Sequence, residues 1–191
     1  MQQTLFYIHG FMSSEQSHKA QLTGQYLSQH LPQVRYLTPR LADEPNIAIE
    51  QLAKLVAQAK LESQVALIGS SLGGFYGHHL SERFGVRAVL INPAVAPYVL
   101  LQDYLGPQTN PYTGNAITIT LQHMAQLRAI EHPVNNAQLL QVWLETGDEV
   151  LDYRQAEQYF HNCDCRIRSG GDHSYQHFAE DLPNMLKFLL A

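Results

Sequence analysis

The sequence has few charged residues and no excess of positive charge. Asp, Glu, Lys and Arg make up 15% of the 191 residues, and 12 cations against 17 anions leave a formal charge of −5. A protein that binds nucleic acid independently of sequence needs clustered cations against the phosphates, so this composition argues against that class. The 19 glutamines partly replace charged residues and indicate a polar but weakly charged surface.

Cysteine is also scarce. Cys163 and Cys165 stand two residues apart in an expected strand, which is a poor geometry for a mutual disulfide. With His161 they could contribute to a metal site, but a third cysteine or a spaced second pair of histidines is missing. We therefore expect free thiols, no metal, no cofactor and a reducing compartment.

Targeting and membrane-spanning segments are likewise not found. The first four residues carry no cationic region, and the longest apolar stretch, 88–101, is interrupted by Asn92, Pro93 and Pro97. These features predict a cytoplasmic protein that has neither a membrane nor a nucleic acid as its partner. The oligomeric state stays open.

Short apolar runs alternate with helical patterns along the chain. Each run is bounded by glycine, proline or asparagine, which is typical of buried strands. The runs are 5–8, 34–37, 65–68, 88–91, 139–144 and 165–167. Strands separated by helices predict an α/β fold, with a mostly parallel sheet of about six strands and helices on both faces.

The segments between the runs contain helix signals. Leu52, Leu55, Val56 and Ala59 have helical spacing. Ser13 with Gln16 resembles a capping box that would open the first helix, and Asp152 with Gln155 predicts a helix over 153–160. The last helix is expected over 178–190, with Pro183 in its first turn or at a kink.

One stretch does not follow the alternation. Residues 94–138 contain four prolines and two glycines and are too long for one crossover, yet too short for a domain. We expect a cap-like excursion over the sheet within a single domain spanning 1–191. Tyr98, Tyr104 and Tyr112 lie in it, and they could either wall a substrate pocket or simply pack the excursion onto the sheet.

The clearest chemical motif is Gly-x-Ser-x-Gly at residues 69–73. It follows a buried run and precedes a helical pattern, which is the strand–turn–helix context of a nucleophile elbow. Gly69 and Gly73 would allow close approach of neighbouring backbone, and Ser71 would be the nucleophile. Ser70 does not fit the frame, because Ile68 and Leu72 stand where it would need glycine.

A nucleophilic serine needs a base and an orienting carboxylate, in the chain order Ser, acid, His. Asp148 follows the expected strand 139–144 and His173 follows the expected strand 165–167, so both would share the carboxyl-end edge of the sheet with Ser71. Among the other candidates, Glu149 is expected to point elsewhere, and Asp152 and Asp172 to cap a helix and form a turn. Among the other histidines, His9 is expected to hold its loop, His78 and His79 to be surface or packing residues on a helix, and His177 to lie in or near the last helix.

Hydrolysis through a serine also needs two donors for the oxyanion. The motif predicts the backbone N–H of Leu72, which follows the nucleophile, and an N–H from the loop after the first strand. That loop is His9-Gly10-Phe11, so the second donor is expected to be the N–H of Phe11.

At this point the chain resembles the α/β-hydrolase superfamily, and in particular the YqiA-type small bacterial esterases. The segments that carry the resemblance are 9–14, 69–74, 92–95, 103–106, 110–114 and 146–156. It implies a compact α/β-hydrolase fold and a cytosolic, cofactor-free esterase, and it names no substrate. Met12 stands where a polar residue such as Asn would be expected, which puts any side-chain contact from that loop in doubt.

These observations predict a serine esterase that hydrolyses carboxylic esters of small or short-chain acyl groups through an acyl-enzyme. An acyl-CoA thioesterase could use the same residues, although no basic patch for the CoA phosphates is evident. A serine aminopeptidase is less favoured, because no acidic cluster or extra domain would hold a peptide amine. A non-catalytic binding protein with the same fold is the alternative of a different class.

Overall fold

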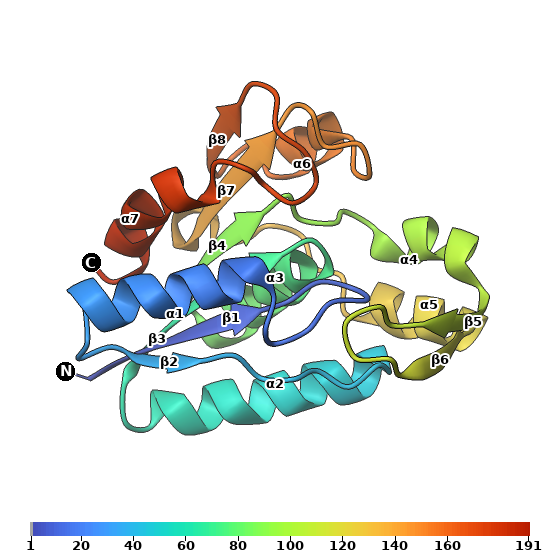
Figure 1. Ribbon diagram of the computed structural model, residues 1–191, viewed down its shortest axis with the longest axis horizontal. Helices are drawn as coiled ribbons and strands as arrows, with labels where there is room; N and C mark the ends of the chain where they lie inside the picture. Colours follow the sequence, from blue (N-terminus) through green and yellow to red (C-terminus); the bar gives the residue numbers. More distant parts are fainter. Residues whose placement is uncertain (1) are drawn as a thin grey trace.

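The computed structural model describes residues 2–191, and its centre is a six-stranded sheet (Figure 1). Every pair of neighbouring strands in this sheet is parallel, and the spatial order is β2-β1-β3-β4-β7-β8. The strands are β1 (Gln3–Ile8), β2 (Arg35–Leu37), β3 (Gln64–Ser70), β4 (Arg87–Ile91), β7 (Leu140–Glu145) and β8 (Asp164–Arg168). The predicted α/β class with a mostly parallel six-stranded sheet is confirmed.

Helices cover both faces of the sheet, because side chains alternate along each strand. One face packs against α1 (His18–His30) and α7 (Phe178–Leu189), with Leu5 and Tyr7 of β1 in that core. The opposite face packs against α2 (Pro45–Lys60), α3 (Leu72–Phe84) and α6 (Tyr153–Tyr159), with Phe6 and Ile8 of β1 in the second core.

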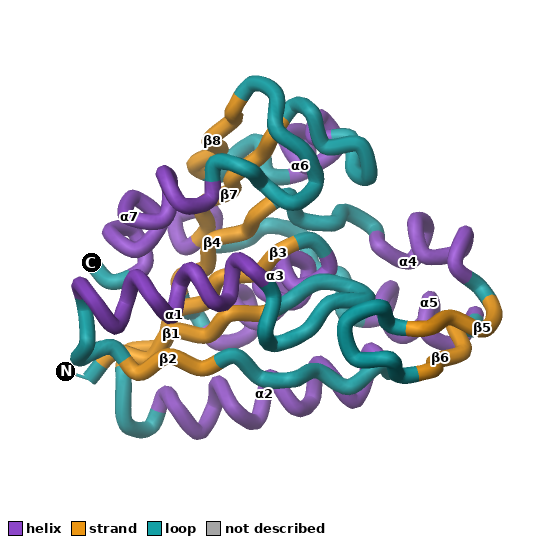
Figure 2. The backbone as a smooth tube through the Cα atoms, viewed as in Figure 1, coloured by secondary structure: helices purple, strands orange, loops and turns teal. Residues whose placement is uncertain are grey.

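The excursion between β4 and β7 has secondary structure of its own. It contains two short helical turns, α4 (Pro97–Leu100) and η1 (Leu101–Tyr104), then an antiparallel hairpin, and then α5 (Leu121–Ala129) and η2 (Ala137–Leu139). The hairpin consists of β5 (Gly106–Thr109) and β6 (Ala116–Ile119) and lies near the N-terminal end of α2 (Figure 2). Sequence periodicity did not indicate this hairpin.

One helix start and the position of one proline differ from expectation. The Ser13–Gln16 pattern opens no helix: Ser14 accepts a hydrogen bond from the Gln16 amide in a turn, and α1 begins only at His18, with Ser17 as its N-cap. Pro183 is the sixth residue of α7 and so lies beyond the first turn. By contrast, Asp152 caps α6 as expected and accepts a hydrogen bond from the Arg154 amide.

The direction in which successive strands are added to the sheet changes at β1. The chain leaves β1 for β2 on one side and returns to β3 on the other, so the loops after β1 and β3 diverge at the carboxyl edge. Ligands of open α/β sheets bind at such a point. No helix within residues 2–191 combines the length and apolar character needed to cross a bilayer.

Candidate active site

Ser71 stands between β3 and α3 in a conformation that few side-chain-bearing residues adopt. Its φ is 57° and its ψ is −121°. A Cβ on Gly69 would overlap the backbone of Gly73, and a Cβ on Gly73 would overlap the carbonyl of Ile8. Both glycines are therefore required by close backbone approach, which is the role expected for them at a nucleophile elbow.

The structure brings Ser71, His173 and Asp148 into one hydrogen-bonded line. Nε2 of His173 lies 3.0 Å from Oγ of Ser71, and Nδ1 of His173 lies 2.8 Å from Oδ2 of Asp148. The Asp148 side chain is 1% exposed, whereas the His173 side chain is 24% exposed. With the Asp148 carboxylate accepting at Nδ1, the neutral ring carries its proton there and leaves Nε2 free to accept from the serine hydroxyl.

Backbone donors hold Asp148 independently of His173. Its Oδ1 accepts hydrogen bonds from the amides of Val150 and Leu151, at 2.9 and 2.8 Å. Glu149 does not point away as expected: its Oε2 lies 3.0 Å from the amide nitrogen of His173. Both acidic residues of this turn thus contact His173, Asp148 through the ring and Glu149 through the backbone.

Two buried residues that the sequence reasoning missed hold the His173 loop (residues 171–177). Glu145, the last residue of β7, is completely buried, and its carboxylate accepts from the amides of Asp172, Gln176 and His177. It also lies 2.7 Å from the ring Nδ1 of His177. A Cβ on Gly171 would overlap this carboxylate, so the loop needs glycine there.

Asn92, just after β4, is the second anchor. Its amide nitrogen donates to the carbonyls of Asp172 and His173, and its Oδ1 accepts from the amide of Glu145. The only sequence signals for this pair were an asparagine and a glutamate at the carboxyl ends of two apolar runs.

The predicted oxyanion donors are the backbone amides of Leu72 and Phe11. Leu72 is the first residue of α3, and the amides of a first helical turn have no hydrogen-bond acceptor within the helix. Phe11 lies in the loop after β1. Within the described part of the chain no residue accepts a hydrogen bond from either amide. We refer to residues 9–13 as the oxyanion loop.

His9 ties the oxyanion loop to the segment before α2. Its Nδ1 contacts the carbonyl of Gly10 at 3.0 Å, and its Nε2 accepts from the amide of Leu41 at 3.4 Å. Burial lowers the pKa of His9, so the neutral ring that fits these two contacts is favoured. This is the structural role expected for His9.

A cavity of about 620 Å³ opens onto Ser71 and His173, and we call it the Ser71 cavity. Phe11, Tyr112, Glu149 and Lys19 are among its lining residues. The Lys19 ammonium donates to the carbonyl of Ser174 at 2.7 Å. Burial lowers the pKa of Lys19 to about 8, although the nearby carboxylates of Asp172, Glu145 and Asp148 favour its charged form.

The three tyrosines of the excursion have different places. Tyr112 lines the Ser71 cavity. Tyr104 packs edge-on against Phe11, with ring centroids 5.6 Å apart, and the Tyr98 hydroxyl donates to the carboxylate of Glu131, just after α5. Tyr98 and Tyr104 do not line this cavity.

The remaining titratable candidates do not line the Ser71 cavity. His78 and His79 are buried in α3, and His177 is the N-cap of α7. Cys163 and Cys165 are free thiols. Across residues 2–191, no three His, Cys, Asp or Glu side chains gather in a way that could hold a metal ion.

Comparison with solved structures defines the class of fold. Est1E from Butyrivibrio proteoclasticus, solved with ferulic acid bound, matches with a TM-score of 0.74 and 14% identity over 98% of this chain and 88% of its own. Mouse alpha/beta hydrolase domain-containing protein 10 matches with a TM-score of 0.73 and 15% identity, over 98% of this chain and 89% of its own. The esterase domain of a Rhodothermus marinus protein matches with a TM-score of 0.68 and 16% identity, over 99% of this chain and 88% of its own. The chain therefore has an α/β-hydrolase fold.

Sequence comparison is more specific. The model of an uncharacterised protein family, UPF0227, matches residues 4–190, and the chain belongs to this family. A UPF0227 protein of Pasteurella multocida (strain Pm70) is 24% identical over 95 residues, or 49% of this chain. That match spans 52% of the relative, about half its length.

Proposed function

We propose that this protein is a serine hydrolase that cleaves carboxylic esters of short acyl groups. The observation that carries the proposal is the line of hydrogen bonds from Ser71 through His173 to Asp148, with Ser71 in a strained elbow. The fold shared with esterases, including one that binds ferulic acid, supports an ester as the substrate.

In the proposed reaction, Oγ of Ser71 attacks the acyl carbon while Nε2 of His173 takes the hydroxyl proton. The carbonyl oxygen becomes an oxyanion on the amides of Phe11 and Leu72. Asp148 holds the tautomer and stabilises the imidazolium. His173 then gives its proton to the leaving alcohol, which breaks the ester bond and leaves an acyl-enzyme. Water, deprotonated by His173, attacks this ester and releases the acid and Ser71.

Hydrolysis of p-nitrophenyl butyrate by wild type and Ser71→Ala tests the proposal. Loss of the nucleophile is expected to lower kcat by at least about 10³-fold. Ser28→Ala, an exposed serine on α1, is the matched control and keeps wild-type turnover. Retention of more than about 10% of kcat in Ser71→Ala would refute the assignment, because that loss is far below the effect of a lost nucleophile.

A further inference from the structure

Lys19, the second residue of α1, places an ammonium group in the wall of the Ser71 cavity. Its Nζ donates one hydrogen bond, to the carbonyl of Ser174, and no carboxylate of residues 2–191 forms an ion pair with it. An ammonium group has three N–H donors, so two of them are left without a protein acceptor. With a pKa of about 8, the amine is mostly protonated at pH 7.

The carboxylates near Lys19 have hydrogen-bond donors of their own. Asp148 and Glu145 accept from backbone amides and from histidine rings. Asp172 accepts from the amide and the hydroxyl of Ser174. These carboxylates favour the charged form of Lys19 through space, but they leave its two remaining N–H groups available to a ligand.

The N-terminus of α1 adds further donors to the same wall. The helix begins near the carboxyl end of β1 (Figure 1), and Ser17, His18 and Lys19 all line the cavity. Within residues 2–191 no group accepts a hydrogen bond from the amides of residues 18–20, and the first turn contains no acidic side chain. The free amides and the dipole of such a helix end attract negative charge.

Hydroxyl groups from the sheet also line the cavity. Tyr7 and Ser70 are 1% and 6% exposed, and burial raises the pKa of Tyr7, so its hydroxyl stays protonated. The Oγ of Ser17, close to the Tyr7 hydroxyl, is buried and has no hydrogen-bond partner of normal geometry among residues 2–191. A buried hydroxyl without a partner is unfavourable, and an anionic ligand would accept from it.

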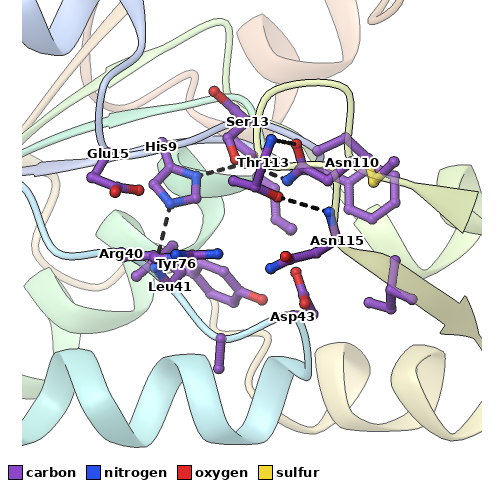
Figure 3. Close-up of a pocket in the computed structure, with 16 residues that line it drawn as sticks. His9, Ser13, Glu15, Arg40, Leu41, Asp43, Tyr76, Asn110, Thr113 and Asn115 are labelled. Carbon is purple, nitrogen blue, oxygen red and sulfur yellow. Dashed lines mark hydrogen bonds between the residues drawn. The ribbon is translucent and has the colours of Figure 1, made fainter.

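The oxyanion loop lines the same cavity and is held from its other side (Figure 3). There Asn110, in the turn of the hairpin, donates from its side chain to the carbonyl of Ser13. Ser71, Phe11 and Lys19 thus share one cavity of about 620 Å³, a usual size for a small-molecule site. An ester bound at Ser71 and a second group bound at Lys19 therefore occupy the same enclosure.

The charges around Lys19 favour an anion with a single charge. Four carboxylates lie near Lys19 or line its cavity: Asp148, Glu145, Asp172 and Glu149. A phosphate would bring up to two negative charges beside them, whereas a carboxylate brings one, which a single ammonium group balances. The two oxygens of a carboxylate also match the two free N–H groups of Lys19.

We propose that Lys19 and the N-terminus of α1 form a subsite for a carboxylate, so that the ester cleaved at Ser71 also carries a free carboxylate group. The inference rests on the proposed ester hydrolysis and names the substrate class within it, with Lys19 as the specificity-determining residue. Lys19 shares its cavity with both Phe11 and His173, so the carboxylate belongs either to the acyl half or to the alcohol half of the ester.

Pairs of nearly isosteric esters, in which a carboxamide replaces the carboxylate, test this subsite. For the acyl half, monoethyl succinate, glutarate and adipate are each compared with the ethyl ester of the matching monoamide. For the alcohol half, the butyrate esters of glycolate and 4-hydroxybutanoate are compared with those of the matching hydroxyamides. Rates are measured in a pH-stat at pH 7, and kcat/KM is divided by the alkaline hydrolysis rate of each ester.

We expect at least one carboxylate to exceed its carboxamide by about tenfold or more, as for a hydrogen bond to a charged group. The arm in which this ratio is found identifies the half of the ester that carries the charge. The ratio compares two substrates of one enzyme sample, so it does not depend on the fraction of folded protein.

Variants link the preference to Lys19. Lys19→Gln removes the charge but keeps an N–H group for the Ser174 carbonyl, and it is expected to lower the ratio to about threefold or less. Lys54→Gln makes the same substitution at an exposed position of α2 and keeps the wild-type ratio. The wild-type comparison decides by itself whether a carboxylate is preferred, even if Lys19→Gln does not fold.

Each other outcome is decisive. Equal rates within every pair, or a preference for the carboxamides, would overturn the carboxylate subsite while leaving ester hydrolysis intact. A carboxylate preference that persists in Lys19→Gln would overturn the role of Lys19. Cleavage of p-nitrophenyl butyrate with none of the carboxylate esters cleaved would also overturn the subsite. No hydrolysis of any ester, including p-nitrophenyl butyrate, would instead reject the proposed function itself.

Discussion

At the scale of single residues, a substitution can remove the charge of Asp148 without moving its side chain. Two backbone amides bind its Oδ1, and the side chain is almost completely buried. An asparagine can keep its oxygen on these amides, but it then presents an NH₂ group to Nδ1 of His173. The ring would be driven to the other tautomer, with its proton on Nε2 facing Ser71.

For Asp148→Asn we therefore expect kcat for p-nitrophenyl butyrate to fall by roughly 10³- to 10⁴-fold, with KM little changed. Steady-state kinetics and a thermal melt of the same sample check this. Asp152→Asn makes the same substitution at the exposed cap of α6 and is expected to keep full activity. A wild-type kcat in Asp148→Asn would show that Asp148 does not orient His173.

At the scale of elements, hydrogen bonds from Asn92, after β4, and Glu145, at the end of β7, hold the His173 loop in place. The two oxygens of Glu145 accept from three amides and one ring nitrogen. A glutamine has only one acceptor oxygen, so its NH₂ group must face at least one of these donors. The loop is then expected to shift and to lengthen the contact from His173 to Ser71.

Glu145→Gln should lower kcat by about 10- to 100-fold and leave KM within about twofold, because a small misplacement of a reacting group is costly. The rate of fluorophosphonate labelling should fall in parallel, which separates poor positioning from simple loss of folded protein. Glu157→Gln makes the same substitution at an exposed position of α6; it is the control and loses less than about threefold. Unchanged kcat with only a lower melting temperature would assign Glu145 a purely structural role.

The elements also show what sequence patterns can predict. The buried strands β1, β3, β4 and β7 are apolar runs ended by breakers, and each was predicted to within two residues. The hairpin of β5 and β6 was missed because each strand has only four residues and seven of the eight are exposed or half-buried, so they form no apolar run. The first helix was expected too early because the Ser13–Gln16 pattern belongs to a turn.

The sequence likewise predicted one part of the site and missed another. Ser71, Asp148 and His173 follow strand ends, so the parallel topology predicts that they meet. Glu145 could not be found this way, since its partners lie 27 to 32 residues later in a loop without a periodic pattern.

At the scale of the whole molecule, buried histidines make stability depend on pH. His78 is 3% exposed, with its ring edge-on to Phe160, and burial lowers its pKa to about 4. The unfolded chain has a histidine pKa of about 6.5, so between these values the unfolded state binds more protons. Stability is complete above pH 6.5 and decreases as the pH falls towards 4. Burial of His9 and His79 acts in the same direction.

We expect the wild type to lose about 2 kcal/mol more unfolding free energy than His78→Phe between pH 7.5 and 4.5, by the proton linkage of one histidine. Urea denaturation of both proteins at the two pH values measures this difference. His161→Phe changes an exposed histidine and should follow the wild type. Identical pH dependence in wild type and His78→Phe would contradict a neutral, buried His78.

The central claim is that Ser71 is a nucleophile activated by His173, and covalent labelling tests it most directly. Folded protein is treated with a fluorophosphonate and analysed by intact mass and peptide mapping, alongside Ser71→Ala and His173→Ala. The account predicts one adduct, located on Ser71, that is absent in Ser71→Ala and much slower in His173→Ala. No adduct on folded wild type, or an adduct that persists in Ser71→Ala, would contradict it.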